Sequence, residues 1–346
     1  MKVIIFYISI ILLITSCNTS AQNKYYNKKN IVTFAFYNVE NLFDIFDDPR
    51  KNDDAFTPKG KKHWTQKRYS KKLDRTSEVL SEINVNELPE FIGLAEVENR
   101  DVLEDLINQK RLKSGNYKII HEESPDKRGI DVALLYRPSD FKELSHRAIP
   151  VSIKSNPNYV TRHILYIKGI LSGTDTIHIF VNHWHSRIGG VKKSEYKRII
   201  AAKTLRNNIN KIFNKNKDAK IIVMGDFNDT PQNKSIYITL FATNKKDNLQ
   251  FDELYNLMYN KSLNGKGTST YSGDWYMLDN LIVSKSLLSG NGFTVTHDGG
   301  MIYDNPKVLY YQNKVGVYVT NQTYGNADRY YGGYSDHLPV YFMLTK

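Results

Sequence analysis

Cysteine is almost absent from this sequence. Its 346 residues include one cysteine, Cys17, so no disulfide can form within the chain. An exported domain without disulfides must be held together by its buried core. The composition allows such a core, because 40% of the residues are hydrophobic and 12% are aromatic. These fractions also exclude general disorder.

Long hydrophobic runs are lacking too. The longest, residues 3–14, is too short to cross a bilayer as a helix. It follows Lys2 and precedes small polar residues, which is the layout of an export signal. The stretch Ile-Thr-Ser-Cys that ends at Cys17 resembles the bacterial lipoprotein box, although an ordinary signal with an incidental cysteine is the alternative. We predict a signal peptide over residues 1–16, lipidation of Cys17, a tether over residues 17–30, and anchoring in the outer membrane of a Gram-negative bacterium, on a face left open.

The sequence also lacks internal repeats, long low-complexity segments and a convincing domain boundary after residue 30. Residues 31–346 are therefore predicted to form one domain, which we expect to be monomeric. Acidic residues are in deficit, since 48 Lys and Arg face 36 Asp and Glu, for a formal net charge of +12. This excess favours polyanionic partners such as nucleic acid or anionic lipid headgroups. A genome rich in lysine and asparagine would produce the same surface, so charge alone does not decide.

Short β-rich runs and amphipathic helical patterns share residues 31–346. Apolar spacing predicts helices over residues 68–83 and 192–213, and another beginning near Val102 with Asp101 as its cap. Several strands follow one another without a helix, which favours mixed sheets. We therefore predict an α/β fold, a four-layer sandwich of two packed mixed β-sheets flanked by helices. The predicted strands are residues 31–37, 91–95, 117–121, 131–136, 163–169, 176–182, 220–224, 278–284 and 340–344.

Polar side chains recur where these strands end, which is where ligand sites lie in α/β folds. Taken singly, each has an ordinary explanation as a turn residue, a helix cap, an ion-pair partner or a buried histidine. Together they form a set of oxygen donors with two imidazoles, which suits Mg²⁺ or Mn²⁺ better than zinc. Such a set fits phosphoester hydrolysis, in which a metal neutralises phosphate and a base activates water. The residues are Asn38, Glu40, Glu96, His183, Asp226, Asn228, Asp279, Asp336 and His337.

The order of these residues resembles the endonuclease/exonuclease/phosphatase superfamily, which includes nucleases of the deoxyribonuclease I type, sphingomyelinases and inositol-polyphosphate phosphatases. The resemblance covers residues 31–346 and is closest to exported bacterial members described as nucleases. It is specific for the superfamily and not for the substrate. The motifs that carry it are YNVENLFD (37–44), GLAEVEN (93–99), RGIDVALLYRP (128–138), NHWHSR (182–187), GDFND (225–229), LDNLIVS (278–284) and GGYSDHLPV (332–340).

The resemblance implies a metal site. Glu96 would be the main ligand, with Asn38 and Glu40 close by and Asp336 completing the set. The expected ion is Mg²⁺, with Mn²⁺ or Ca²⁺ as alternatives. Hard oxygen ligands are consistent with all three ions.

It also implies the roles of the catalytic residues. His337 would be the general base, and Asp279 would hold its other ring nitrogen. His183 would contact the scissile phosphate or protonate the leaving oxygen. Asp226 and Asn228 would position water or phosphate, and Asp226 could instead assist deprotonation or bind a second metal.

Basic and aromatic residues suggest how substrate is held. Arg187 and Arg162 are candidates to bind phosphate. Residues 59–75 and the Tyr-rich residues 303–334 could contact a phosphate backbone and stack on bases, although packing within the protein explains them equally well. His185 stands where the nearest relatives commonly have proline; this extra imidazole could contact phosphate, but a solvent-exposed turn is its expected place.

Three functions remain open. A metal-dependent nuclease acting on DNA or RNA outside the cytoplasm is the leading interpretation, because net charge and the basic-aromatic segments support it. A phosphatase or phospholipid-headgroup phosphodiesterase on the same scaffold is the second. A non-catalytic binding lipoprotein is the third, and the intact set of acidic and histidine residues argues against it.

Overall fold

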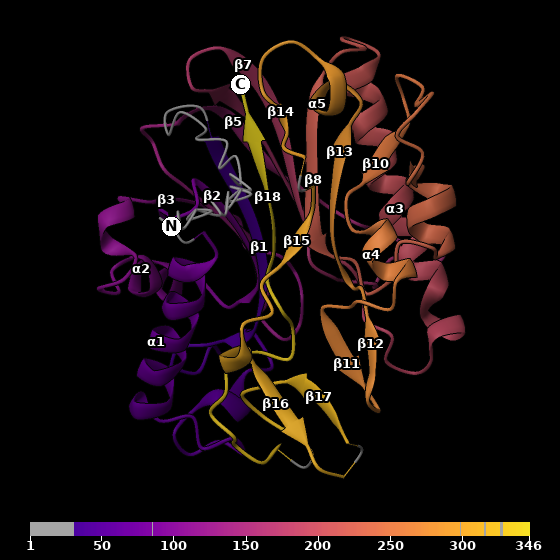
Figure 1. Cartoon of the computed structure of the whole chain (residues 1–346). Helices are drawn as coiled ribbons and strands as arrows, with labels where there is room; N and C mark the ends of the chain where they lie inside the picture. Colours follow the sequence, from indigo (N-terminus) through magenta and orange to yellow (C-terminus); the bar gives the residue numbers. More distant parts are fainter. Residues whose placement is uncertain (1–30, 85, 298, 315, 326–327) are drawn as a thin grey trace, which may run out of the picture.

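The computed structural model describes residues 31–346 except 85, 298, 315, 326 and 327. The predicted signal peptide, Cys17 and the tether lie outside the described residues. Two seven-stranded mixed sheets are packed face to face between outer helices, which confirms the predicted four-layer α/β sandwich (Figure 1). Among the described residues, no helix combines the length and the apolar character needed to span a membrane.

Sheet A has the strand order β14-β18-β1-β2-β4-β3, and β15 also pairs with β18. The first and last long strands of the domain are antiparallel neighbours, with Ile31 opposite Thr345, whereas β1 and β2 are parallel. The strands are β1 (Ile31–Leu42), β2 (Phe91–Val97), β3 (Lys118–His121), β4 (Asp131–Tyr136), β14 (Thr294–Val295), β15 (Met301–Ile302) and β18 (Val340–Thr345).

Sheet B has the order β5-β6-β7-β8-β13-β10-β9, with β7 parallel to β8 and β13 antiparallel to β8. Its central strands β8 and β13 are buried along their whole length, as expected for strands covered on both faces. The strands are β5 (Phe141–Ile149), β6 (Ile164–Leu171), β7 (Asp175–His183), β8 (Lys220–Asp226), β9 (Ala242–Thr243), β10 (Leu254–Asn256) and β13 (Asp279–Ser284).

Helices cover both outer faces. Helices α1 and α2 pack on sheet A through residues such as Leu73 and Leu103, and α3 packs on sheet B through Leu205 and Ile209 (Figure 1). Asn99 caps α2 by accepting a hydrogen bond from the backbone of Val102, so the predicted Asp101 cap is wrong by two residues. The helices are α1 (Gln66–Glu82), α2 (Arg100–Ile107), α3 (Val191–Phe213), α4 (Tyr259–Leu263) and α5 (Ser286–Ser289), with single turns at Asp54–Phe56, Lys113–Gly115, Ser235–Thr239 and Pro306–Val308.

The sheets meet in an apolar layer that includes Phe34, Phe91 and Met224. Phe34 and Phe91 stack with their ring centroids 4.2 Å apart. A Cβ atom at Gly93 would lie 2.6 Å from the sulfur of Met224, so glycine allows the close approach of the sheets at this point. This tight layer fixes the strand ends that carry the polar residues.

Two short hairpins project from the end of the sandwich at which β18 begins (Figure 1). They lie side by side and are formed by β11 (Ser269–Tyr271) with β12 (Asp274–Tyr276), and by β16 (Leu309–Gln312) with β17 (Val317–Thr320). The second hairpin occupies part of the Tyr-rich segment, in which no strand was predicted from the sequence.

Candidate active site

The polar residues chosen from the sequence meet at one end of the two sheets. His183 at the end of β7 and Asp279 at the start of β13 both lie opposite Asp226 at the end of β8. Glu96 comes from β2 of the facing sheet, and His337 lies just before β18. Asn38 comes from β1, so six strands of the two sheets supply the site, as expected for a ligand site beyond strand ends.

Bulges turn the strand ends of sheet A toward the site. The pairing register shifts between Asn38 and Leu42 and again between Ala95 and Val97. Glu40 and Glu96 have positive φ values of 51° and 63°, which are uncommon for residues with a side chain. A bulge redirects the side chains around it, so these local distortions aim the polar groups away from the regular pleat.

His337 and Asp279 form a buried pair. Nδ1 of His337 lies 2.6 Å from Oδ2 of Asp279, which is itself fully buried. Oγ of Ser335 accepts a hydrogen bond from the backbone of His337 and donates one to the carbonyl of Asn38. Burial alone would lower the pKa of His337, but the Asp279 and Asp226 carboxylates outweigh it and raise that pKa well above its usual value. With Nδ1 on Asp279, the imidazole presents Nε2 to the site.

Oδ2 of Asp226 is the centre of the polar network. It accepts hydrogen bonds from the amides of Asn38 at 3.0 Å and Asn228 at 3.3 Å. Nε2 of His183 lies 3.5 Å from the same oxygen, and Nε2 of His337 lies 3.8 Å from it. Burial raises the pKa of Asp226 to about 7, against the opposing pull of His337. Asp226 therefore lies among the other side chains of the site, and its positioning role and its other roles stay predictions.

The surroundings of His183 favour a neutral imidazole. Burial lowers its pKa well below the usual value, and the charges of Arg162 and Arg128 act in the same direction. Its Nε2 also lies 3.8 Å from Oε1 of Glu96, so the ring sits between that carboxylate and Asp226. A neutral imidazole can donate a hydrogen bond to a phosphate oxygen from one nitrogen.

The groups best placed to hold a cation are Glu96 and Asp336. Both are partly exposed, whereas the other carboxylates of the site are buried. Burial raises the pKa of Asp336, and the nearby charge of Glu96 raises it further. A carboxylate whose charge is disfavoured by a neighbouring carboxylate is suited to binding a divalent cation, and oxygen donors fit Mg²⁺. Asp226, Asp279 and His337 form a second close group of possible ligand atoms.

Glu40 does not fit the predicted role of metal ligand. Its two carboxylate oxygens accept hydrogen bonds from the backbone N–H groups of Thr323, at 2.6 Å, and Tyr324, at 3.0 Å. The side chain therefore ties the end of β1 to the loop that leads to His337. Asn38 is near the metal side, as predicted, but its side-chain oxygen accepts from the backbone of Glu40 while its nitrogen faces Glu96 and Asp226.

Lys72 is a buried cation close to Glu40 and Asp336 that was not predicted from the sequence. This lysine is 2% exposed and donates to Oγ1 of Thr323 and the carbonyl of Tyr334. Burial lowers its pKa, and the charges of Glu40 and Asp336 oppose that change. Lys72 stands on the same face of α1 as Tyr69 and Thr76, so a lysine on an otherwise buried helical face was the available signal.

The comparisons with known proteins decide the family. The model of the endonuclease/exonuclease/phosphatase family matches residues 33–346. The chain belongs to this family. The search of curated proteins found no match.

Solved structures of the family share the fold at low identity. TDP2 of D. rerio complexed with single strand DNA product is 13% identical, with a TM-score of 0.54 over 91% of this chain and 99% of that one. A mannosyl-6-phosphatase of Bacteroides thetaiotaomicron is 15% identical, with a TM-score of 0.55 over 91% and 100% of the two chains. The human Nocturnin catalytic domain with bound sulfate is 17% identical, with a TM-score of 0.53 over 91% and 94%. These likenesses support the fold and leave the substrate of this family member open.

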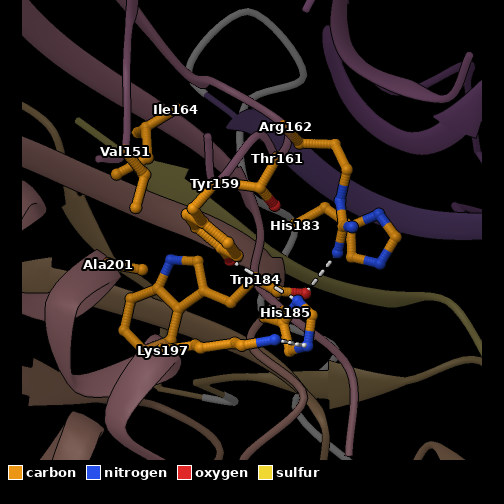
Figure 2. A pocket seen from close by; sticks show the side chains of 10 residues that line it. All are labelled: Val151, Tyr159, Thr161, Arg162, Ile164, His183, Trp184, His185, Lys197 and Ala201. Carbon is orange, nitrogen blue, oxygen red and sulfur yellow. Dashed lines mark hydrogen bonds between the residues drawn. The ribbon is translucent and has the colours of Figure 1, made fainter. Parts of the chain in front are cut away.

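The two arginines predicted to bind phosphate differ in their burial and in the groups that they bond. Arg162 is 4% exposed, and its guanidinium bonds Asp126 and the carbonyl of Trp184, so it lies behind the site and does not fit direct substrate binding (Figure 2). Arg187 is less buried, with a side chain that is 20% exposed, and it donates from Nε to the carbonyl of Asn228 and from Nη2 to Oδ1 of Asn233. Phosphate binding therefore remains a prediction for Arg187.

His185, the departure from the usual family motif, faces inward. It lines a small pocket behind His183, where its Nε2 lies 3.0 Å from Nζ of Lys197 (Figure 2). Burial and the charge of Lys197 lower the pKa of His185 to about 4. The expectation of a solvent-exposed turn histidine is wrong, because this side chain is a neutral acceptor for a lysine.

The aromatic side chains of the predicted basic-aromatic segment are engaged within the protein, whereas Lys59, Lys67 and Lys71 are exposed. Trp64 and Tyr69 are buried and cannot stack on a substrate. Arg68 lies 4.1 Å from the ring centre of Tyr330, and Lys62 lies 4.2 Å from that of Tyr324. Exposed tyrosines are found on and beside the two hairpins, at Tyr271, Tyr310, Tyr311, Tyr318 and Tyr331, and Phe46, Tyr196, Phe241 and Phe251 are exposed elsewhere.

Proposed function

We propose that this protein is a metal-dependent phosphodiesterase that cleaves nucleic acid outside the cytoplasm. The observation that carries the proposal is the His337–Asp279 pair, held at 2.6 Å opposite Asp226, His183 and Glu96. A binding protein would have no need to bury a carboxylate behind an imidazole in this way. The same geometry is the one a general base requires, with one ring nitrogen fixed and the other facing the site.

His337 would take the proton from the attacking water through Nε2. Asp279 would hold the tautomer and stabilise the imidazolium that forms. That water and the phosphate would be positioned by Asp226, Asn228 and Asn38, which hydrogen-bond one another. Acid–base groups of this kind each contribute about 10²–10⁴-fold.

Glu96 and Asp336 would hold the divalent cation. When bound, the cation would neutralise phosphate oxygens and offset the carboxylate charge that raises the pKa of His337. His183, neutral and beside Asp226, would donate a hydrogen bond to the scissile phosphate.

A nucleic acid substrate is supported by charge and by the exposed tyrosines. The chain has a formal net charge of +12, which favours a polyanion. Tyr271, Tyr310 and Tyr318 are 57–76% exposed on the hairpins at the site end of the molecule, where bases could stack on them. We further propose that Cys17 carries a lipid that anchors the enzyme in the outer membrane, and that a polar tether links it to the catalytic domain.

The test uses purified residues 18–346 with Mg²⁺, Mn²⁺, Ca²⁺ or a chelator, and offers plasmid DNA, RNA, sphingomyelin, inositol phosphates and a sugar phosphate. Metal-dependent cleavage of nucleic acid that is lost in His337→Ala supports the proposal. Turnover of only the lipid or small phosphoesters would replace the nuclease with the second candidate, a phosphatase or lipid phosphodiesterase. No turnover of any of them would favour a binding protein. Radiolabelled palmitate incorporated into the full chain, and not into Cys17→Ala, tests the anchor.

A further inference from the structure

A second group of ligand-type side chains lies away from the catalytic residues, at the open edge of sheet A. His121 ends β3, Asp131 begins β4 and Glu123 stands in the loop between them. One nitrogen or oxygen atom from each lies within 4.8 Å of the others. None of these residues takes part in the catalysis proposed above.

Two of the three groups are buried and incompletely bonded. The side chains of His121 and Asp131 are 4% and 1% exposed. Nε2 of His121 and Oδ2 of Asp131 have no hydrogen-bond partner among the described residues, although they lie 3.5 Å apart. The other oxygen of Asp131 accepts from the backbone of Ser124 at 3.0 Å. Buried polar atoms normally have partners, so this pair calls for a ligand.

The geometry and the donors fit a transition metal. Zinc ligands lie about 2.1 Å from the ion, so two of them in tetrahedral geometry are about 3.4 Å apart. The observed separation of 3.5 Å between His121 and Asp131 is close to this value. An imidazole with two carboxylates suits Zn²⁺ or a similar ion more than Mg²⁺ or Ca²⁺. We propose that His121, Glu123 and Asp131 bind one divalent transition-metal ion of the Zn²⁺ class.

The neighbouring cation, Lys51, pairs with only one of the three proposed ligands. Lys51 is the competing partner, with its Nζ 3.8 Å from Oε2 of Glu123 and 2.8 Å from the carbonyl of Ser124. It pairs with Glu123 and leaves the buried atoms of His121 and Asp131 unbonded. Nearby, His163 has a buried Nδ1 without a partner among the described residues, and burial lowers its pKa against the pull of Asp131.

The ion would hold a loop that reaches the catalytic site. The loop of residues 122–130 carries Asp126, which bonds Arg162, and Arg162 bonds the carbonyl of Trp184 next to His183. The same loop carries Arg128, whose charge contributes to the low pKa of His183. Clamping both ends of the loop would therefore fix positive charge beside the catalytic imidazole.

The test measures binding of Zn²⁺ to residues 18–346 in excess Mg²⁺, which occupies the catalytic carboxylates. We expect one Zn²⁺ per chain and a Tm increase of about 2–4 °C or more in the wild type. His121→Asn and Glu123→Gln should lose that ion or bind it at least about tenfold more weakly, and should lose the Tm increase. His146→Asn removes a neighbouring imidazole that is already paired with Glu122 and Glu143, so it should behave as the wild type.

Equal Zn²⁺ binding by the wild type and both variants would overturn the proposal, as would a wild type that binds no Zn²⁺ or responds only to Ca²⁺. Glu123 is exposed, so Glu123→Gln is expected to fold even if His121→Asn does not. Because the readout is metal content and Tm, it is independent of whether the nuclease proposal holds.

Discussion

Replacing Asp279 with asparagine tests the catalytic pair directly. The change preserves size at a fully buried position and removes the charge 2.6 Å from Nδ1 of His337. Two unit charges about 4 Å apart interact by about 4 kcal/mol at an effective dielectric constant of about 20. Losing that interaction with the imidazolium formed in the transition state corresponds to about 10³-fold in kcat. An asparagine amide also favours the wrong tautomer of His337, which adds to the loss.

The assay compares kcat and KM for the cleaved substrate, with circular dichroism and Tm to confirm folding. Glu90→Gln is the matched control, since Glu90 is also a buried carboxylate but precedes β2 at the opposite end of the sheet, where it pairs with Arg137. We expect Glu90→Gln to change stability and leave kcat within about threefold of the wild type. A folded Asp279→Asn enzyme with kcat in that same range would refute the assignment of His337 as a base oriented by Asp279.

Three further predictions follow from the site. Glu96→Gln should raise the Mg²⁺ concentration for half-maximal rate by at least about tenfold, as measured by metal titration of activity; an unchanged midpoint would remove Glu96 from the metal site. Glu40→Gln should lower the free energy of unfolding by about 1–3 kcal/mol in urea, because the backbone N–H groups of Thr323 and Tyr324 lose part of their acceptor, and should leave the Mg²⁺ midpoint in place. The reverse result would restore Glu40 as a ligand. His185→Gln should keep kcat within about threefold between pH 5 and 8, because the pKa of His185 is about 4 and the group does not titrate there; a large loss would show that this imidazole takes part in the chemistry.

The buried strands could be predicted because both their faces are covered. β4 was predicted with the bounds it has, and β8 and β13 to within two residues, since each contains at least three consecutive apolar residues. β5 was missed because it is an edge strand whose exposed middle, Lys142–Arg147, reads as a polar loop. The short strands of the hairpins were not predicted for a similar reason, since little of their surface is buried.

The site was predictable where residues lie directly at strand ends. The family resemblance implied that His337 contacts Asp279, and the structure places the two side chains in contact. Glu40 and Arg162 could not be placed in the same way, because no sequence pattern points to the groups that they bond. Thr323 is 283 residues from Glu40, and the carbonyl that Arg162 bonds belongs to Trp184. A charged residue near a motif can bind the substrate or stabilise the fold, and only its tertiary contacts distinguish these two roles.

The two ends of the described domain assemble the site together. β18 pairs with β1 over its whole length, and Oγ of Ser335 bonds the carbonyl of Asn38 while Glu40 holds the backbone of Thr323. The proposed base, His337, is therefore fixed by the first strand, next to the metal side, and by Asp279 from the facing sheet. Without this pairing, Glu96 and Asp226 would lack the proposed base. Hydrolysis should thus require the docked C-terminal strand.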